Sequence, residues 1–301
     1  FHLPTNIDDS KTLFGNLTQN FEAQIMSFAI VMILTAYFVA KGVKSGIEKL
    51  NFTLMPLLFV IFFGLLIYAM TLDSFGESVA FMFAPDFSKI TPKVLIEAMG
   101  QVFFSLSLGI GIIVTYAAFT EKKQNLFSAA MWVLIPGIII SIVAGLMIFT
   151  FVFEYGTKDD VGAGAGLVFI TLPVLFGKMG SVGSVICVLF MIGLGFAGLS
   201  STISLLEPAV KWLEDKTGKN RVVLSWVVSL VVFLIGSVLI LSLNEGHKEL
   251  TIAGKSLFDW MDWLSANIIM TLGGLLATIF VGYAIKTEHL REWTSHYFTP
   301  F

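Results

Sequence analysis

Charged residues are scarce in this sequence. Asp, Glu, Lys and Arg make up 13% of its 301 residues, whereas 56% are hydrophobic. A soluble domain carries roughly 25% charged residues, so this chain has too little polar surface to face water on all sides. Its mean hydropathy of +0.88 agrees with that conclusion. The composition therefore argues against a soluble globular protein and favours a chain that lies in a membrane.

Cysteine and the usual signatures of catalysis are also nearly absent. Cys187 is the only cysteine, so the chain cannot form an internal disulfide. There is no basic run and no nucleic-acid-binding motif, which argues against a nucleic acid as a partner. No nucleophile–base pair and no set of residues with metal-ligand spacing stands out. We therefore do not expect an enzyme.

Long hydrophobic runs, in contrast, are abundant. A helix needs about 20 apolar residues to cross the hydrocarbon core of a bilayer. Lipid cannot satisfy the open edge of a strand, so all such runs should be helices and the chain an all-α integral membrane protein. Seven stretches qualify: Ala23–Ala40, Phe52–Leu72, Val94–Phe119, Leu126–Phe153, Ser184–Leu206, Val222–Leu243 and Leu264–Ile285.

The loops between these spans alternate in charge. Acidic residues predominate in residues 73–86 and 154–160, and basic residues in 41–49, 120–124, 211–221 and 286–291. Because positively charged loops stay in the cytoplasm, we expect the segment 1–22 to be extracellular and the tail 286–301 cytoplasmic. No signal peptide is present to carry residue 1 outward. Either a signal has been removed or earlier spans precede residue 1, and we expect earlier spans.

A glycine-containing loop, residues 161–179, follows the fourth span. It ends in "LVFITLPVLFGKM", and these thirteen fairly apolar residues are too few to cross a membrane. We expect a short helix that lies in the outer face or dips toward it. Such a helix could close a pathway as a lid, or it could simply pack against the spans.

Two serines and two glycines interrupt the third span in "FFSLSLGIGII" (Phe103–Ile113). Glycine costs a helix about 1 kcal/mol, and serine can divert backbone hydrogen bonds, so we expect local unwinding. Unwound backbone at membrane depth is tolerated where it lines a cavity or is buried in protein. It marks binding sites in transporters; the alternative is close helix packing through small residues.

The fifth span contains a second cluster of small residues, "GFAGLSSTISLLEP" (Gly195–Pro208). Ala197, Ser200 and Ser201 follow one another at i, i+3 and i+4 and so share one helix face. Their carbonyl and hydroxyl oxygens are hard ligands, which suit a small cation such as sodium. Glu207 lies near the end of this span. A carboxylate at that depth is a functional candidate by default, or a structural group that bonds a neighbouring helix.

The two interrupted stretches resemble a known family. "GQVFFSLSLGIGIIVTYAAF" and "FAGLSSTISLLEPAVKWLED" are similar to the sixth and eighth helices of the neurotransmitter:sodium symporters, especially bacterial amino-acid transporters such as LeuT. The resemblance continues through "YFVAKGVKSGIEKLN", "MPLLFV", "APDFSKI", "LVFITLPVLF" and "SLFDWMDWLSANIIMTLGGLL". It implies one transmembrane domain (1–301) with a LeuT-type inverted-repeat bundle. Residues 23–93 would hold family helices four and five, and 94–285 the second repeat, helices six to ten. The chain would then be a fragment without helices one to three.

The resemblance also implies roles for individual residues. The substrate pocket would contain Phe104, Ser105, Ser107, Gly109, Ile110, Thr202 and Leu205. The second sodium site would use Ala197, Ser200 and Ser201, and the first Ser105 and Gly137. The family's asparagine is replaced at Gly137, which offers only a carbonyl. Chloride would meet Gln101, Ser105 and Ser141. Gate residues would be Phe104, Gln101, Asp262 at the outer gate and Asp215 at the inner gate.

The implied function is sodium-coupled symport of an amino acid by alternating access. Ile110 in the pocket favours a hydrophobic substrate. The implied location is a bacterial plasma membrane, with lipid and a second copy of the chain as partners. Two alternatives stay open: a truncated, non-transporting binding or regulatory protein, and a seven-helix receptor. A receptor would match the number and orientation of the spans, but it would not need two clusters of small residues.

Overall fold

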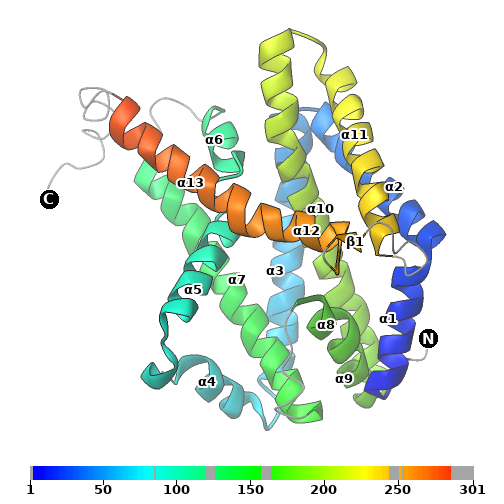
Figure 1. Ribbon diagram of the computed structural model, residues 1–301. Helices are drawn as coiled ribbons and strands as arrows, with labels where there is room; N and C mark the ends of the chain where they lie inside the picture. The colour runs from blue at the N-terminus through cyan, green and yellow to red at the C-terminus, as the bar shows by residue number, and fades with distance from the viewer. Residues whose placement is uncertain are drawn as a thin grey trace, which may run out of the picture.

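The computed structural model describes residues 3–84, 86–119, 126–156, 164–243, 251–252 and 254–285. This part of the chain is almost wholly helical (Figure 1). One two-stranded hairpin occurs in it, with Thr251–Ile252 (β1) antiparallel to Lys255–Ser256 (β2). In chain order the helical segments are α1 (Ile7–Gln19), α2 (Phe21–Ala40), η1 (Val43–Glu48), α3 (Lys49–Ala69), α4 (Phe75–Phe83), η2 (Phe87–Lys89), α5 (Pro92–Ser105), α6 (Ile112–Ala117), α7 (Leu126–Tyr155), α8 (Gly164–Gly166), η4 (Leu167–Thr171), α9 (Leu172–Lys178), α10 (Ser181–Thr217), α11 (Arg221–Ser242), α12 (Leu257–Trp263), η6 (Leu264–Ile269), α13 (Met270–Ile279) and η7 (Phe280–Ala284).

Six continuous helical runs in the described residues are long and apolar enough to cross a membrane. They are Phe21–Ala40, Val43–Ala69, Phe127–Tyr155, Ser181–Thr217, Arg221–Ser242 and Leu257–Ala284. The predicted span Val94–Phe119 is not among them, because it is divided into α5 and α6. Six of the seven predicted spans are thus continuous helices, and the third is divided at the interruption that the sequence predicted.

The fifth predicted span is much longer than expected. We predicted Ser184–Leu206, but α10 continues through Pro208 to Thr217 and stops at Gly218, which adopts the left-handed conformation with φ +64°. The extension has an apolar face that is buried. Val210 is fully buried and packs in one cluster with Val39 and Leu224. Packing therefore keeps this stretch helical, although its charged residues predicted a loop.

The main core lies between α3, α7, α9 and α10 and is rich in phenylalanine. Phe62 stacks on Phe190 with ring centroids 6.0 Å apart. Phe176 lies 5.9 Å from both Phe151 and Phe190. A second cluster joins α2, η1, α10 and α11 around Val39 and Ile203. Most other large apolar side chains on the long helices are exposed, as expected for surfaces that face lipid.

The short helix predicted in residues 161–179 is present as η4 and α9, and residues 161–163 lie outside the described part. Leu172 and Phe176 are fully buried. The hydroxyl of Ser10 donates to the carbonyl of Ile170 at 2.8 Å, which joins η4 to α1. The segment is thus packed into the bundle; its role as a lid stays a prediction.

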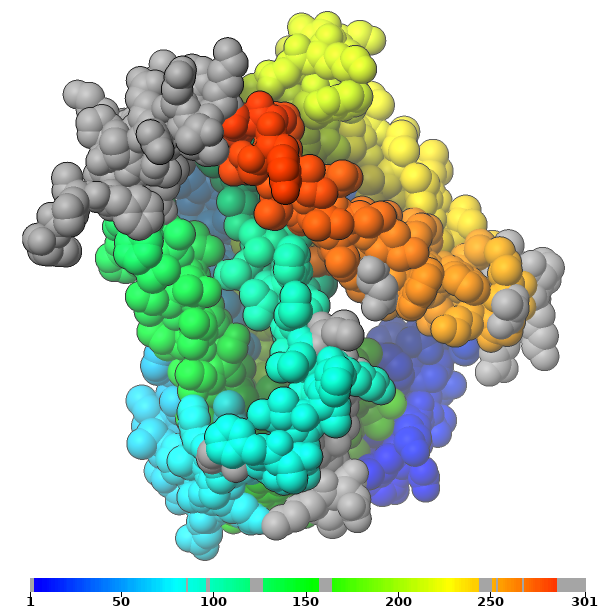
Figure 2. All heavy atoms as spheres, turned by 60° about the vertical axis from the view of Figure 1, so that its left-hand side comes forward, coloured from blue at the N-terminus to red at the C-terminus, as the bar shows by residue number. Residues whose placement is uncertain are grey.

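The last helical run, α12 to η7, crosses the bundle obliquely (Figure 1). In the space-filling view it lies beside α5 and α6 (Figure 2). The contact is close, because α13 packs directly on the backbone of the segment that separates α5 from α6. The predicted cytoplasmic tail, 286–301, lies outside the described residues.

Candidate functional site

The third span is broken between Ser105 and Ile112. Ser107 has a φ of +53°, and Gly109 and Gly111 have φ values of +87° and +79°. Such angles belong to the left-handed region, where glycine pays no steric penalty and serine is uncommon. The amide of Leu108 donates to the carbonyl of Phe103 at 2.9 Å, and regular helical bonding resumes with Thr115 to Gly111. The predicted unwinding is therefore present at the predicted residues.

Glycines allow the last span to pack closely against this break. A Cβ on Gly109 would lie 2.1 Å from the Met270 carbonyl oxygen, and one on Gly273 would lie 2.0 Å from the Gly109 oxygen. A Cβ on Gly274 would meet the Phe103 ring at 2.3 Å. Backbone thus packs directly on backbone, which only glycine allows. Unwinding and close small-residue packing, two alternatives in the sequence, occur together here.

The residues before the break face outward. Phe104 is 63% exposed, and Gln101 and Ser105 are exposed as well. The Gln101 amide donates to the Ser105 hydroxyl at 3.3 Å, so two predicted chloride residues are brought together. In the part of the chain that the structure describes, no hydrogen bond joins Phe103–Ser107 to the predicted pocket residues of α10.

Beyond the break, α6 packs on α10. The Tyr116 hydroxyl lies 3.0 Å from the Ser204 hydroxyl. A Cβ on Gly111 would be 3.9 Å from that of Pro208. The two stretches singled out in the sequence therefore do meet, through their carboxyl-terminal ends.

Three consecutive hydroxyls of α10 have different partners. Ser200 donates to the Asn51 side-chain oxygen on α3 at 2.8 Å. Ser201 donates to the Ala197 carbonyl of its own helix at 2.9 Å. Thr202 lies 2.9 Å from the Thr35 hydroxyl on α2. The predicted second-sodium residues thus lie together on α10, while Leu205 is 55% exposed. The sequence analysis missed Asn51, which hydrogen-bonds to Ser200 from α3, and Thr35, which hydrogen-bonds to Thr202 from α2.

The predicted first-sodium and chloride residues of α7 bond each other. The Ser141 hydroxyl donates to the Gly137 carbonyl at 2.8 Å, and both residues are exposed. In this arrangement neither the Ser141 proton nor that carbonyl lone pair is directed at an ion. No hydrogen bond among the described residues joins this pair to Gln101 or Ser105.

The two predicted gate carboxylates lie on different helices. Asp215 forms an ion pair with Lys211 one turn earlier on α10, at 2.6 Å. Its side chain is 61% exposed, so this contact contributes little to stability. Asp262 is exposed on α12. Among the described residues, no hydrogen bond or ion pair joins either carboxylate to the broken segment.

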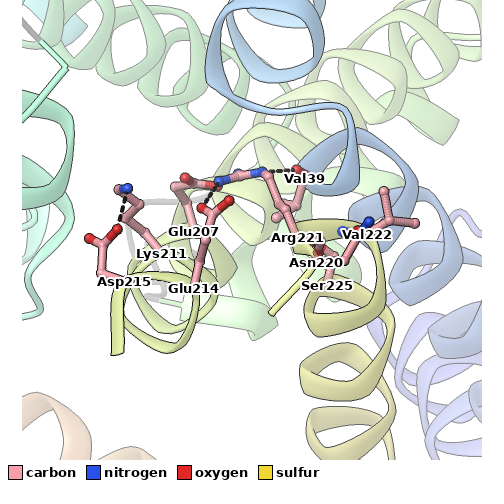
Figure 3. Close-up of polar contacts among 9 residues, drawn as sticks. All are labelled: Val39, Glu207, Lys211, Glu214, Asp215, Asn220, Arg221, Val222 and Ser225. Carbon is pink, nitrogen blue, oxygen red and sulfur yellow. Dashed lines mark hydrogen bonds and ion pairs between the residues drawn. The ribbon is translucent and has the colours of Figure 1, made fainter. Parts of the chain in front are cut away.

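A buried ionic cluster lies beside Asp215 (Figure 3). Arg221, at the start of α11, forms an ion pair with Glu207, which is fully buried in α10. Its guanidinium also reaches Glu214 at 3.2 Å and donates to the Val39 carbonyl of α2 at 3.0 Å. The structure therefore supports the structural interpretation of Glu207, because its carboxylate pairs with an arginine that joins α10, α11 and α2. Arg221 was classed in the sequence as a loop charge, and its place at a helix start was the overlooked signal.

Two apolar hollows lie away from all these residues. One, of about 420 Å³, is between α2, α11 and α12, beside Phe28 and Gly236. The other, of about 170 Å³, is between α2 and α11, beside Trp226. No predicted site residue lines either of them. Their walls are mainly apolar, with Gln24 and Ser27 as the polar side chains in the first and Ser229 in the second.

Comparison with known proteins places the chain among transporters. The model of the sodium:neurotransmitter symporter family matches residues 5–296. An uncharacterized sodium-dependent transporter of Haemophilus influenzae is 34% identical over 299 residues, which cover 99% of this chain and 65% of that protein. The sodium-dependent transporter YhdH of Bacillus subtilis is 34% identical over 281 residues, covering 93% and 61%. This chain thus spans less than two thirds of either relative.

The fold is shared with a solved structure. The crystal structure of MhsT in complex with L-phenylalanine matches with a TM-score of 0.82 and 35% identity, over 96% of this chain and 64% of that one. The predicted fold class, an all-α membrane bundle of the LeuT type, is confirmed. The prediction that the chain is a fragment is not supported by the family match, which runs over residues 5–296.

Proposed function

Because the chain belongs to the sodium:neurotransmitter symporter family, whose members are transporters and not enzymes, we propose that it couples sodium entry to the uptake of an amino acid. The observation that carries this proposal is the break at residues 106–111. Its helix ends and freed backbone groups can bind the charged ends of an amino acid without a charged side chain. Ser107 lies in the left-handed region, which residues other than glycine rarely adopt, and such backbone conformations cluster at functional sites.

The substrate is best matched by a hydrophobic amino acid. Ile110 within the break and Leu205 on α10 offer apolar contacts for a side chain, and MhsT was solved with L-phenylalanine. Phe104, Ser105, Ser107, Gly109 and Thr202 complete the proposed pocket. Because Phe104 is exposed, it has room to turn over a bound substrate as a gate.

Sodium would bind to the oxygens of Ala197, Ser200 and Ser201. These are neutral oxygen donors on one face of α10, the ligand type that a small hard cation prefers. A second ion at Ser105 and Gly137 requires Ser141 to release the Gly137 carbonyl. In the proposed second site Ser201 likewise donates to the Ala197 carbonyl, so each site contains one such bond, and Ser200 is the hydroxyl that bonds outside its own helix.

Chloride is a further candidate ion. Gln101, Ser105 and Ser141 carry the amide and hydroxyl donors that an anion needs. Binding would require the Ser141 proton to turn away from Gly137. Replacing chloride by gluconate in the uptake assay tests this, since an unchanged rate would rule the site out.

The ends of the bundle support the proposed orientation across the plasma membrane. The basic segment after α2 lies at the same end as the α10–α11 link, because Arg221 reaches Val39. At the other end the Glu154 carboxylate accepts from the Ser74 amide at 2.9 Å, so two acidic loops meet there. By the positive-inside rule the end with the basic segment and the α10–α11 link is cytoplasmic. Asp215 would then serve an inner gate and Asp262 an outer one.

Uptake by the purified protein in proteoliposomes tests the proposal. Labelled L-phenylalanine should accumulate under an inward sodium gradient and not under a potassium gradient. Ser200→Ala and Ser201→Ala should each raise the sodium concentration for half-maximal uptake. Ser237→Ala is the matched control, because Ser237 bonds only the Phe233 carbonyl on α11.

The alternatives predict other outcomes in the same assay. A non-transporting binding protein would bind the amino acid with sodium but show no accumulation. A receptor would bind its ligand without any dependence on sodium. Either result would overturn the proposal. Crosslinking in native membranes would show whether a second copy of the chain is a partner.

A further inference from the structure

We infer that Asn51 is a positioning residue for sodium, acting by directing the hydroxyl of Ser200. This inference rests on the proposed function, and in particular on the sodium site at Ala197, Ser200 and Ser201. Asn51 lies on α3, and Ser200 on α10, and the Ser200 hydroxyl donates to the Asn51 side-chain oxygen at 2.8 Å.

The packing of α3 on α10 fixes the positions of these two residues. A Cβ on Gly193 would lie 3.0 Å from the Phe62 ring and 3.4 Å from Leu58, so the helices approach closely there. Asn51 precedes Leu58 by seven residues, and Ser200 follows Gly193 by seven. Seven residues are close to two helical turns. In this antiparallel pairing the glycine contact therefore brings Asn51 and Ser200 level with each other.

The chemistry of a hydroxyl explains why this partner matters. A serine hydroxyl has one proton and two lone pairs. A cation is bound by a lone pair, so the proton must point elsewhere. In a helix that proton usually goes to the carbonyl four residues earlier, as it does from Ser201 to Ala197. Asn51 instead draws the Ser200 proton across to α3, so the two lone pairs of that hydroxyl point away from α3.

The location supports a role beyond structure. Asn51 is half-buried in a span whose other side chains are mainly apolar. A polar side chain in a transmembrane helix is costly and usually has a purpose. On this helix the neighbouring Thr53 is exposed and bonds only weakly, at 3.4 Å, to the Lys49 carbonyl. The helix thus provides an exposed polar control residue whose hydrogen bond stays within α3.

The test measures sodium and amino-acid dependence separately in the intact protein. Asn51→Leu removes the acceptor with little change in volume, and it should raise the sodium concentration for half-maximal uptake by about fivefold or more. The apparent affinity for the amino acid at saturating sodium should stay within about twofold. Asn51→Asp restores an acceptor oxygen and should restore sodium affinity. Thr53→Val should have no effect.

A double substitution tests whether Asn51 acts through the Ser200 hydroxyl. In a Ser200→Ala background, Asn51→Leu should add nothing, because the hydroxyl that it directs is gone. If Asn51→Leu does not fold, Asn51→Ala is measured in the same way. Unchanged sodium dependence in the folded variant, or an equal added loss in the Ser200→Ala background, would overturn the inference. Absence of sodium-dependent uptake in the unaltered protein would instead overturn the proposed function.

Discussion

Arg221 forms an ion pair with the buried carboxylate of Glu207 where α2, α10 and α11 meet (Figure 3). Glu207 is fully buried, and Arg221 is 15% exposed. Replacing Arg221 by Met would leave that charge without a partner. We expect a loss of about 3–5 kcal/mol of stability, measured as a fall in the midpoint of thermal unfolding in detergent.

The reverse change is a strict control on that reasoning. Glu207→Gln removes the charge and keeps the shape, so it should cost less than Arg221→Met. The double variant Glu207→Gln/Arg221→Met should regain part of the loss, because no charge is left buried. Equal midpoints for Arg221→Met and the double variant would contradict this explanation.

Gly109 should tolerate no side chain. Its φ of +87° belongs to the left-handed region, and a Cβ would lie 2.1 Å from the Met270 carbonyl oxygen. We expect Gly109→Ala to separate the break from α13 and to abolish both monodisperse yield and uptake. Gly195→Ala is the matched control, because a Cβ there meets nothing within 4 Å. Normal uptake by Gly109→Ala would show that the close contact is dispensable.

Sequence reasoning predicted the parts of the fold that composition and local conformation decide. The span positions follow from hydropathy, and the break follows from Ser105, Ser107, Gly109 and Gly111, whose preferences are local. It could not predict that α10 runs to Thr217. That extension depends on the burial of Val210 against α2 and α11. Such burial is a tertiary contact, which local sequence does not specify.

The supporting residues of the site were missed for the same reason. Ser200 and Ser201 are conspicuous in the sequence, because hydroxyls are unusual within an apolar run. Asn51 is more than a hundred residues away, and only the register between α3 and α10 brings it to Ser200. Arg221 likewise looked like one more loop charge. Sequence patterns thus identified the hydroxyls of α10 as candidates for ligand binding, but not the residue on α3 that hydrogen-bonds to one of them.

The contact between Tyr116 and Ser204 should control the mobility of α6. The two hydroxyls are 3.0 Å apart, and α6 is only six residues long, so it is too short to form many backbone hydrogen bonds within itself. Tyr116→Phe removes a hydrogen bond worth about 1 kcal/mol. We expect faster amide exchange in residues 112–117, measured by hydrogen–deuterium exchange. Amides of α11 serve as the internal control, and equal acceleration there would indicate general loosening instead.

Cys187 should report on opening of the main core. It is the chain's only cysteine, is 7% exposed, and packs in the cluster that includes Phe62 and Phe190. Thiol reagents need access to the sulfur, so we expect the folded protein in detergent to resist N-ethylmaleimide and to react fully once it is unfolded. Thr217→Cys in a Cys187→Ser background is the control, because Thr217 is exposed at the end of α10. It should react at once in the folded protein. Rapid reaction of Cys187 in the folded protein would mean that α10 separates from α3 in the resting state, which the Phe62–Phe190 stacking and the Asn51–Ser200 bond oppose.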